Sequence, residues 1–290
     1  LTTLGGKPTP VLPNVSCTEE TSLGDPVFIQ LCKNRQLVEV NQTRIVGDYT
    51  LTLQRAYVDA NQLLFEYNAR QISTGKAVSL DAQKLDVILQ NTSDSISLNH
   101  TGINSAYGRS GDLPIGVAVL NIGAFPQNLR AFNLHIIMHS FHLGISTGPT
   151  DQRPVVQGDA NFGFSLPFHP GQTINPAQSI MVNGQTRNTN LAITANGTTY
   201  MLYQIVITPS MISLYTTGIL SDKLSSYALA FNGQEIQANS EVMSVSDSQK
   251  PHTVFAFETP RLFHQHGTLT LSVNVNDDLT NSQILLINLP

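Results

Sequence analysis

Apolar and polar residues alternate with a period of two along much of this chain, which is typical of half-buried β-strands rather than helices. The alternation is clearest in LTLQRAYVDANQLLFEY at 51–67 and YMLYQIVITPSMISLY at 200–215. The small residues 59–61 (DAN) separate two alternating runs in the first stretch, as a tight reversal requires. Proline in the 208–210 segment (TPS) ends any helix in the second. Each stretch therefore predicts a β-hairpin.

The likeness of these two hairpins extends along the chain and predicts an internal repeat. Leu53 corresponds to Leu202, and three further pairs of segments follow in the same order: 85–90 with 227–232, 117–119 with 254–256, and 132–138 with 269–275. NFGFSLPF at 161–168 closes the first copy, and QILLINL at 283–289 closes the second. Matches in a constant order indicate two copies of one domain.

The 290 residues are enough for two such domains. We expect an N-terminal extension at 1–36, a first domain at 37–170 and a second at 171–290. Asn-Gly pairs that favour tight hairpin turns follow the predicted strands, at 183–184, 196–197 and 232–233. The predicted fold class is all-β, with two tandem immunoglobulin-like antiparallel β-sandwich domains behind the extension.

Two smaller features complete this prediction. The segments 79–85 (SLDAQKL) and 221–227 (SDKLSSY) each precede a predicted strand in their copy, and we expect short helices there. Pro167, Pro170 and Gly171 near the domain boundary predict a hinge or a stiff elbow.

Charge and hydropathy narrow the classes of function. Charged residues make up 12% of the chain and its net charge is −5, without clusters of Lys or Arg, which argues against a nucleic-acid partner. Apolar runs stay shorter than the roughly 20 residues of a membrane helix. Because the sequence starts at Leu1 without an initiator methionine, we expect an upstream segment such as a membrane anchor.

The two cysteines, Cys17 and Cys32, both fall in the extension. In an exported chain we predict a disulfide between them, which would add about 3 kcal/mol of stability for a loop of about 15 residues. The alternative is a pair of unrelated thiols in a cytosolic protein. No histidine is spaced to complete a zinc site with them.

Candidate catalytic residues are few. GISTG at 144–148 has the form of the esterase nucleophile elbow around Ser146, but that elbow needs a helix directly after it, and Pro149 follows instead. We therefore expect a loop, without a catalytic serine. No pair of carboxylates and no cofactor-binding fingerprint stands out from the sequence. We therefore predict neither enzymatic activity nor a cofactor.

Candidate metal ligands also have simpler explanations. On a strand, His135 and His139 would lie about 13 Å apart and His142 would point the other way, so we expect no shared metal. His264 and His266 would lie about 6.6 Å apart on one strand face, without a third ligand. We predict no metal site from either group.

The oxygen-bearing side chains of NVNDDLTN are the other metal candidates, around Asp277 and Asp278. Calcium takes such ligands, but the pattern lacks the glycine and glutamate of a helix-loop-helix calcium site. An ordinary turn at the end of a strand explains it as well, so calcium binding there stays open.

The pattern x-L-T-L-x-x-A-Y-V-D-x-x-x-L-x-x-x-Y at 51–67 and the aromatic strand FGFSLPF, followed by a second domain with a VNGQT turn, resemble one known group of proteins. These are the paired β domains in the extracellular part of membrane-bound bacterial regulators, negative effectors of extracytoplasmic-function sigma factors. The resemblance covers most of 38–290, but Cys17 and Cys32 are not part of it. It implies an extracellular, non-enzymatic sensor or scaffold, anchored by a membrane helix upstream of Leu1.

The alternative is a secreted or surface-attached adhesion or ligand-binding protein. The partner in either case would be an extracellular ligand or protein that the sequence does not identify.

Overall fold

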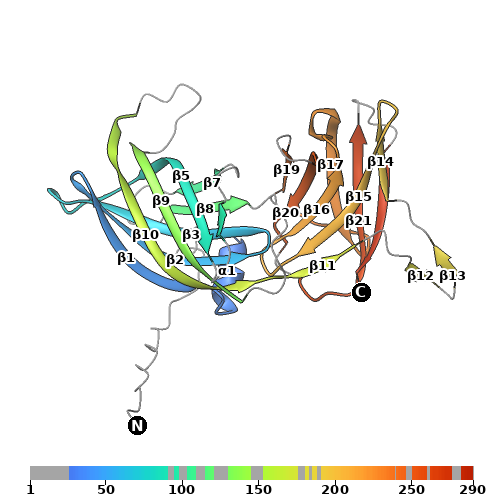
Figure 1. Cartoon of the computed structure of the whole chain (residues 1–290), viewed down its shortest axis with the longest axis horizontal. Coiled ribbons are helices and arrows are strands. Elements are labelled where there is room, and N and C mark those ends of the chain that lie inside the picture. The colour runs from blue at the N-terminus through green and yellow to red at the C-terminus, as the bar shows by residue number, and fades with distance from the viewer. Residues whose placement is uncertain are drawn as a thin grey trace, which may run out of the picture.

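The structure is a computed structural model, and the description covers most of the chain. The described residues are 26–90, 95–97, 103–108, 115–120, 130–144, 153–175, 180–182, 185–187, 191–238, 240–245, 250–259, 262–275 and 282–289. This part of the chain is mostly β, arranged in antiparallel sheets that form two lobes (Figure 1).

A ten-stranded sheet makes up the first lobe, which we call the first unit. Its main path is β6-β5-β9-β10-β2-β3-β8-β7, with β1 beside β2 and β4 beside β3. The strands are β1 (Val38–Val46), β2 (Tyr49–Asp59), β3 (Gln62–Gln71), β4 (Ala77–Val78), β5 (Leu80–Gln90), β6 (Ser95–Ser97), β7 (Ile103–Gly108), β8 (Ile115–Leu120), β9 (Ala131–Leu143) and β10 (Val155–His169).

The second lobe, the second unit, holds a six-stranded and a four-stranded sheet. The first follows β11-β15-β16-β20-β19 with β14 beside β15, and the other follows β18-β17-β21-β22. The elements are β11 (Gln172–Ile174), β14 (Ala192–Ala195), β15 (Thr198–Ile207), β16 (Ile212–Thr217), the 3₁₀ helix η1 (Ser221–Lys223), β17 (Leu224–Phe231), β18 (Gln234–Glu235), β19 (Ser240–Val245), β20 (His252–Phe257), β21 (Gly267–Val275) and β22 (Gln283–Leu289). A separate ribbon pairs β12 (Ile180–Val182) with β13 (Gln185–Arg187).

The strand order is the same in both units. The path β14-β15-β16-β20-β19 repeats β1-β2-β3-β8-β7, and β18-β17-β21-β22 repeats β6-β5-β9-β10, with every pair antiparallel. The units differ where the end of β10 reaches β2 in a short parallel pairing at Phe168 and His169. The predicted repeat of strand order is therefore confirmed.

The two central hairpins also share their register. The β2–β3 ladder shifts between Leu53 and Arg55, and the β15–β16 ladder shifts between Leu202 and Gln204. A bulge at the same point of each hairpin makes Leu53 equivalent to Leu202, as the sequence alignment predicted.

Two other parts of that alignment are wrong by one or two residues. The predicted match of Leu134 to Leu271 fixes the neighbouring strands. Leu134 pairs with Leu89, and Leu271 pairs with Leu229. Leu89 therefore corresponds to Leu229, and not to Phe231 as the alignment had it. Likewise, the residue that pairs with Phe65 is Val117, and the residue that pairs with the equivalent Leu214 is Phe255 rather than Val254. Alternating strands look alike at several registers, and only the cross-strand partners separate them.

A helix, α1 (Pro26–Lys33), lies in the predicted N-terminal extension, where the sequence analysis expected none. Val27, Phe28 and Leu31 are buried with Tyr57 and Leu64, so the helix covers β2 and β3. Its signals were a proline at the first helical position and apolar residues at one- and four-residue spacing. This part of the extension belongs to the fold of the first unit, while residues 1–25 lie outside the described part.

The helix predicted at 79–85 is wrong, because that segment begins β5. The backbone of β5 pairs with β9 from Leu80 to Gln90, and the buried side chains of Leu80, Val87 and Leu89 join the core of the first unit. The helix predicted at 221–227 is limited to η1, after which the chain enters β17. Pairing with neighbouring strands overrides local helix preference at both places.

The chain passes from the first unit to the second without a loop. β10 ends at His169 and β11 begins at Gln172, so that Pro170 and Gly171 alone separate them. β11 then pairs with the end of β15, where Gln172 lies opposite Ile207. The crossing is therefore two residues long and lies between two paired strands, and the choice between a hinge and a stiff elbow stays a prediction.

Two of the predicted Asn-Gly turns are confirmed. Both residues have positive φ at 196–197 and at 232–233, as the type I′ turn of a two-residue hairpin requires. The pair at 183–184 lies outside the described residues. Among the described helices, none is long and apolar enough to cross a membrane.

Candidate functional site

The turns of the two equivalent hairpins meet at the junction between the units, with Asp59 at the centre. Its Oδ1 accepts hydrogen bonds from the backbone N–H groups of Asn61 (2.8 Å) and Gln62 (2.9 Å), which fixes its own turn. Its Oδ2 accepts hydrogen bonds from Tyr57 (2.9 Å) and, across the junction, from the hydroxyl of Ser210 (2.5 Å). The carboxyl group of Asp59 is buried and accepts hydrogen bonds from both units.

Asn61 makes the complementary contacts. Its side-chain amide nitrogen lies 3.1 Å from the carbonyl oxygen of Val206, 3.3 Å from the hydroxyl of Thr208 and 3.1 Å from the carbonyl oxygen of Met211. All four residues are buried. A single amide group therefore binds the end of β15, at Val206, and the turn that follows it, at Thr208 and Met211.

These contacts are related by a local two-fold relationship. The shared register of the hairpins makes Asp59 equivalent to Thr208 and Asn61 equivalent to Ser210. If each residue is replaced by its equivalent in the other unit, the contact between Asp59 and Ser210 becomes a contact between Thr208 and Asn61. Both contacts are present. This one pair of contacts is therefore reciprocal, as contacts across the interface of a symmetric dimer are. We call Asp59, Asn61, Thr208 and Ser210 the clasp.

Apolar packing surrounds the clasp. Val206, Tyr215 and Val254 of the second unit are buried in the same cluster as the core of the first unit. On the other side, the ring of His169 stacks on Tyr57 with 5.1 Å between ring centres. Such burial stabilises the junction mainly through removal of apolar surface from water.

Burial also sets the electrostatics of the clasp. It raises the pKa of the Asp59 carboxyl above its ordinary value, although the hydrogen bonds from Ser210 and the two turn amides oppose the change. Burial lowers the pKa of His169, and the charge of Asp59 opposes this in turn. The donors around Asp59 are two amides of its own turn, the hydroxyl of Tyr57 on the same strand, and the hydroxyl of Ser210 in the second unit.

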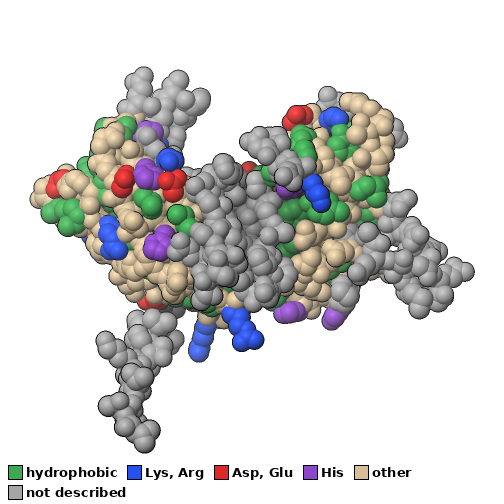
Figure 2. Space-filling model, in the orientation of Figure 1, with side chains coloured by type: hydrophobic (Ala, Val, Ile, Leu, Met, Phe, Trp, Pro, Cys, Tyr) green, Lys and Arg blue, Asp and Glu red, His purple; other side chains and the backbone are tan. Residues whose placement is uncertain are grey.

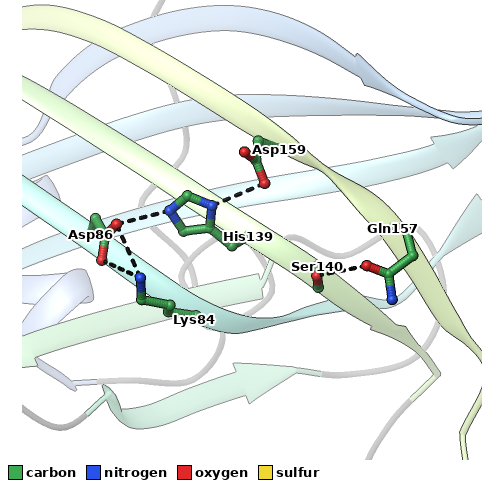
Figure 3. Close-up of polar contacts among 6 residues, drawn as sticks. All are labelled: Lys84, Asp86, His139, Ser140, Gln157 and Asp159. Carbon is green, nitrogen blue, oxygen red and sulfur yellow. Dashed lines mark hydrogen bonds and ion pairs between the residues drawn. The ribbon is translucent and has the colours of Figure 1, made fainter.

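A second polar cluster lies on the surface of the first unit, where Asp86 of β5, His139 of β9 and Asp159 of β10 meet (Figure 3). The Nε2 atom of His139 is 2.9 Å from Asp86, and its Nδ1 atom is 2.9 Å from Asp159. Lys84 lies 3.3 Å from the other oxygen of Asp86. We call Asp86, His139 and Asp159 the histidine bridge. In the space-filling view, histidine and acidic side chains lie together on this lobe (Figure 2).

The bridge changes the pKa of its members. Partial burial alone lowers the pKa of His139, but the hydrogen bonds to Asp159 and Asp86 outweigh it and raise this pKa above its ordinary value. The hydrogen bond from His139 lowers the pKa of Asp86. A histidine held by carboxylates on both ring nitrogens has no nitrogen left to accept a proton from a nucleophile. As placed, it cannot act as a general base.

The three histidines predicted on a strand are on β9, and the strand prediction is confirmed. One detail was wrong, namely the direction of His142. Ser140 has a φ of +47° at a bulge, after which Phe141 is buried and His142 is only half-buried, so His142 no longer points to the opposite side from His139. Its ring nitrogen contacts Arg153.

Histidines 264 and 266 are not on a strand, which corrects the prediction of a shared strand face. They precede β21 in a turn, where His264 has a φ of +62° and its ring lies 3.8 Å from that of Phe263. Within the described residues, no group of three or more His, Cys, Asp or Glu side chains is arranged to hold a metal ion.

Several predictions fall outside the described residues. Ser146 lies there, so its expected loop stays a prediction, as does the calcium alternative at Asp277 and Asp278. Cys17 lies there too, and the disulfide with Cys32 stays a prediction. Cys32 itself is buried at the end of α1, with its sulfur 3.5 Å from Nη1 of Arg55.

Sequence reasoning named His139 as a candidate ligand, but it missed the carboxylate partners of His139 and the contacts of the clasp. Asp59 and Asn61 were recognised as turn residues, and an aspartate two residues before an asparagine gives no sign of a partner in another domain. Asp86 and Asp159 drew no attention, because single acidic residues on alternating strands are common. The positions of strands relative to one another create both clusters.

Comparisons with known proteins show likeness of structure alone. No model of a known protein family matches the chain, and no curated protein matches it. Among solved structures, it is similar to a conserved domain protein from Bacillus anthracis, at 12% identity and a TM-score of 0.49, over 88% of this chain and 90% of that one. A marsupial T cell receptor (12% identity, TM-score 0.22, 86% and 97% covered) and tandem immunoglobulin domains of titin (9%, 0.19, 82% and 94%) also match. At this level the likenesses imply no shared function.

Proposed function

We propose that this chain is a non-enzymatic extracytoplasmic sensor or scaffold, the outer part of a membrane-anchored anti-sigma-type regulator. In this proposal its two units are tandem immunoglobulin-like sandwich domains, with the boundaries 37–170 and 171–290. The clasp is the observation that carries the proposal. Its hydrogen bonds, together with the two-residue crossing from β10 to β11, couple the units into one body.

Rigid coupling suits a protein that passes on a signal or holds a fixed shape. Linked domains move relative to each other by default unless their interface is large and apolar. Here Val206 and Tyr215 share the first unit's apolar core, and buried hydrogen bonds fix the orientation. A ligand that binds one unit would therefore act on both.

A transcription experiment in the host organism tests the proposal. The coding region for residues 38–290 is deleted while the rest of the gene is kept, and the RNA of the cells is sequenced. A regulator predicts changed expression of one set of genes that share an extracytoplasmic-function sigma promoter. The double variant Asn61→Ala/Ser210→Ala, which opens the clasp, should change the same set, and the exposed-residue variant Asp222→Asn should not.

An unchanged RNA profile in the deletion strain would contradict the regulator. The purified chain should also hydrolyse a simple ester no faster than its Ser146→Ala variant. A clear loss of hydrolysis in that variant would contradict the non-enzymatic assignment.

A surface-attached adhesion or ligand-binding protein is the second candidate. Large apolar side chains exposed on the second unit favour it, since such residues mark binding surfaces when they lie together. Ile284 and Leu286 on β22 are 62% and 55% exposed. This candidate predicts that Ile284→Ser/Leu286→Ser weakens attachment to a surface and leaves transcription unchanged.

A further inference from the structure

Both ring nitrogens of His139 face a hydrogen-bond acceptor. Both of its ring nitrogens lie 2.9 Å from carboxylate oxygens, which accept hydrogen bonds when ionised. A neutral imidazole carries one N–H and can satisfy only one of these oxygens. The imidazolium carries two N–H groups and satisfies both, so the arrangement fits the protonated ring.

The charges that face the ring agree with this requirement. β5 contributes Lys84 and Asp86, and β10 contributes Asp159. Protonation of His139 gives two positive and two negative charges, whereas the neutral ring leaves one negative charge in excess. Its own strand adds His135 and His142, and Arg44 of β1 contacts β10 further along, at the carbonyl oxygen of Asn161.

The bridge lies at the last regular pair before a bulge. His139 is directly opposite Asp159, and the ladder then shifts so that Phe141 is opposite Val156. Gly158, with a φ of +136°, precedes Asp159 in this bulge. The backbone of a bulge lacks regular ladder hydrogen bonds, so side chains have a larger share in holding the start of β10 against β9.

We propose that Asp86, His139 and Asp159 form a proton-dependent clamp that fixes residues 155–159 of β10 against β9 and loosens them as the proton of His139 is lost. Asp159 is the arm that lets go, because its side chain is 62% exposed and makes no second ion pair within the described part of the chain, whereas Asp86 also contacts Lys84. The clamp is independent of whether the chain is a regulator or an adhesin.

The direction with pH follows from the raised pKa of His139. A histidine whose pKa is higher in the folded protein contributes stability that is complete below its unfolded value. This stability is lost as the pH rises through the folded value. The clamp therefore holds fully below pH 6.5 and loosens as the pH rises through the folded pKa, which lies above 6.5.

Hydrogen exchange on the whole chain tests the clamp. Protection factors, which remove the intrinsic effect of pH on exchange, are measured for the amides of 155–159 on both sides of the titration of His139. Protection should fall by up to about fivefold as His139 loses its proton, the size expected for an exposed charged pair. The variant His139→Gln should remove this dependence, and His135→Gln, on the same strand, should keep it.

A second variant separates the clamp from a general effect on folding. Asp159→Asn changes an exposed side chain, keeps the histidine, and should shift the NMR titration of His139 to lower pH. It should also give 155–159 the same protection at both pH values. Protection in the wild-type chain that does not change across the titration, or a titration of His139 that Asp159→Asn leaves unmoved, would overturn the proposal.

Discussion

The hydroxyl of Ser210 donates a hydrogen bond of 2.5 Å to Oδ2 of Asp59, although the two residues are 151 positions apart in the chain. Both belong to turns of equivalent hairpins, and both are buried. The equivalent contact in the other direction joins Asn61 and Thr208. Substitutions at these residues test directly how much the junction contributes to stability.

The first prediction concerns the acceptor at Asp59. Asp59→Ala leaves the hydroxyls of Tyr57 and Ser210 and the amides of Asn61 and Gln62 without an acceptor, and should lower the free energy of unfolding by about 3–5 kcal/mol. Asp59→Asn keeps an oxygen for the turn amides and offers its NH₂ to the hydroxyls, so it should cost only about 1 kcal/mol. Urea unfolding of both variants measures the difference. A loss of about 1 kcal/mol or less in Asp59→Ala would mean that the hydrogen bonds of the clasp contribute little.

The second prediction concerns pH. Because the pKa of Asp59 is raised in the folded chain, the folded state binds more protons than the unfolded state between the two values, so the stability from this group falls as pH rises. The contribution is complete below the ordinary value of 3.8 and is lost as the pH passes the folded pKa. Stability of the wild type minus that of Asp59→Asn, measured from acid to neutral pH, should therefore decrease. A difference that grows with pH would show that Asp59 is ionised more easily in the folded chain.

The third prediction concerns the crossing between units. Gly171 has a φ of +73°, and a β-carbon there would lie 2.6 Å from the carbonyl oxygen of Ile207. Gly171→Ala should cost about 3 kcal/mol or more, from backbone strain together with overpacking. Gly75→Ala is the matched control, since its φ is +69° with no atom within 4 Å, and it should cost about 1 kcal/mol. Similar unfolding midpoints for the two variants would argue against close packing at the crossing.

The fourth prediction concerns the buried ion pair of Arg55 and Glu66 beneath α1. Arg55→Met alone strands a buried carboxylate and should cost about 3–5 kcal/mol. The double variant Arg55→Met/Glu66→Leu removes both charges, and Oε2 of Glu66 is buried without a hydrogen-bond partner among the described residues. It should be as stable as the wild type or more so. A double variant that is less stable than the wild type would show that the pair contributes net stability.

The fifth prediction concerns Cys17 and Cys32. Protein isolated from its native compartment should take up no alkylating reagent until it is reduced, as mass spectrometry would show. Reduction should then lower stability by about 3 kcal/mol, the value expected for a loop of about 15 residues. Two alkylated thiols before reduction would rule out the disulfide.

The extent to which the sequence predicts this fold can be judged from particular elements. The hairpins at 51–67 and 200–215 were predictable, because a clear period of two and a short turn are local signals. β5 was not, because Leu80 and Leu85 fit a short helix as well as a strand until β9 is known to lie alongside. α1 had local signals as well, at Pro26 and in the apolar residues after it.

The two clusters were less accessible than the strands. The contacts of Asp59 with Ser210 depend on how two hairpins dock, and those of His139 depend on the order β5-β9-β10 and on a bulge at Ser140. Neither depends on spacing along the chain. For residues brought together by sheet topology, single-sequence patterns contain no direct signal.

The passage of the chain from β10 to β11 has a practical consequence for dissecting the protein. β11 covers the edge of β15 at Ile205–Ile207, next to the part that β14 covers. A fragment that starts after Ile174 would leave this stretch of edge bare, with free backbone groups beside apolar side chains, and such edges pair with other chains. Anyone who expresses the second unit alone should therefore begin it no later than Gln172, and place any solubilising tag ahead of that strand.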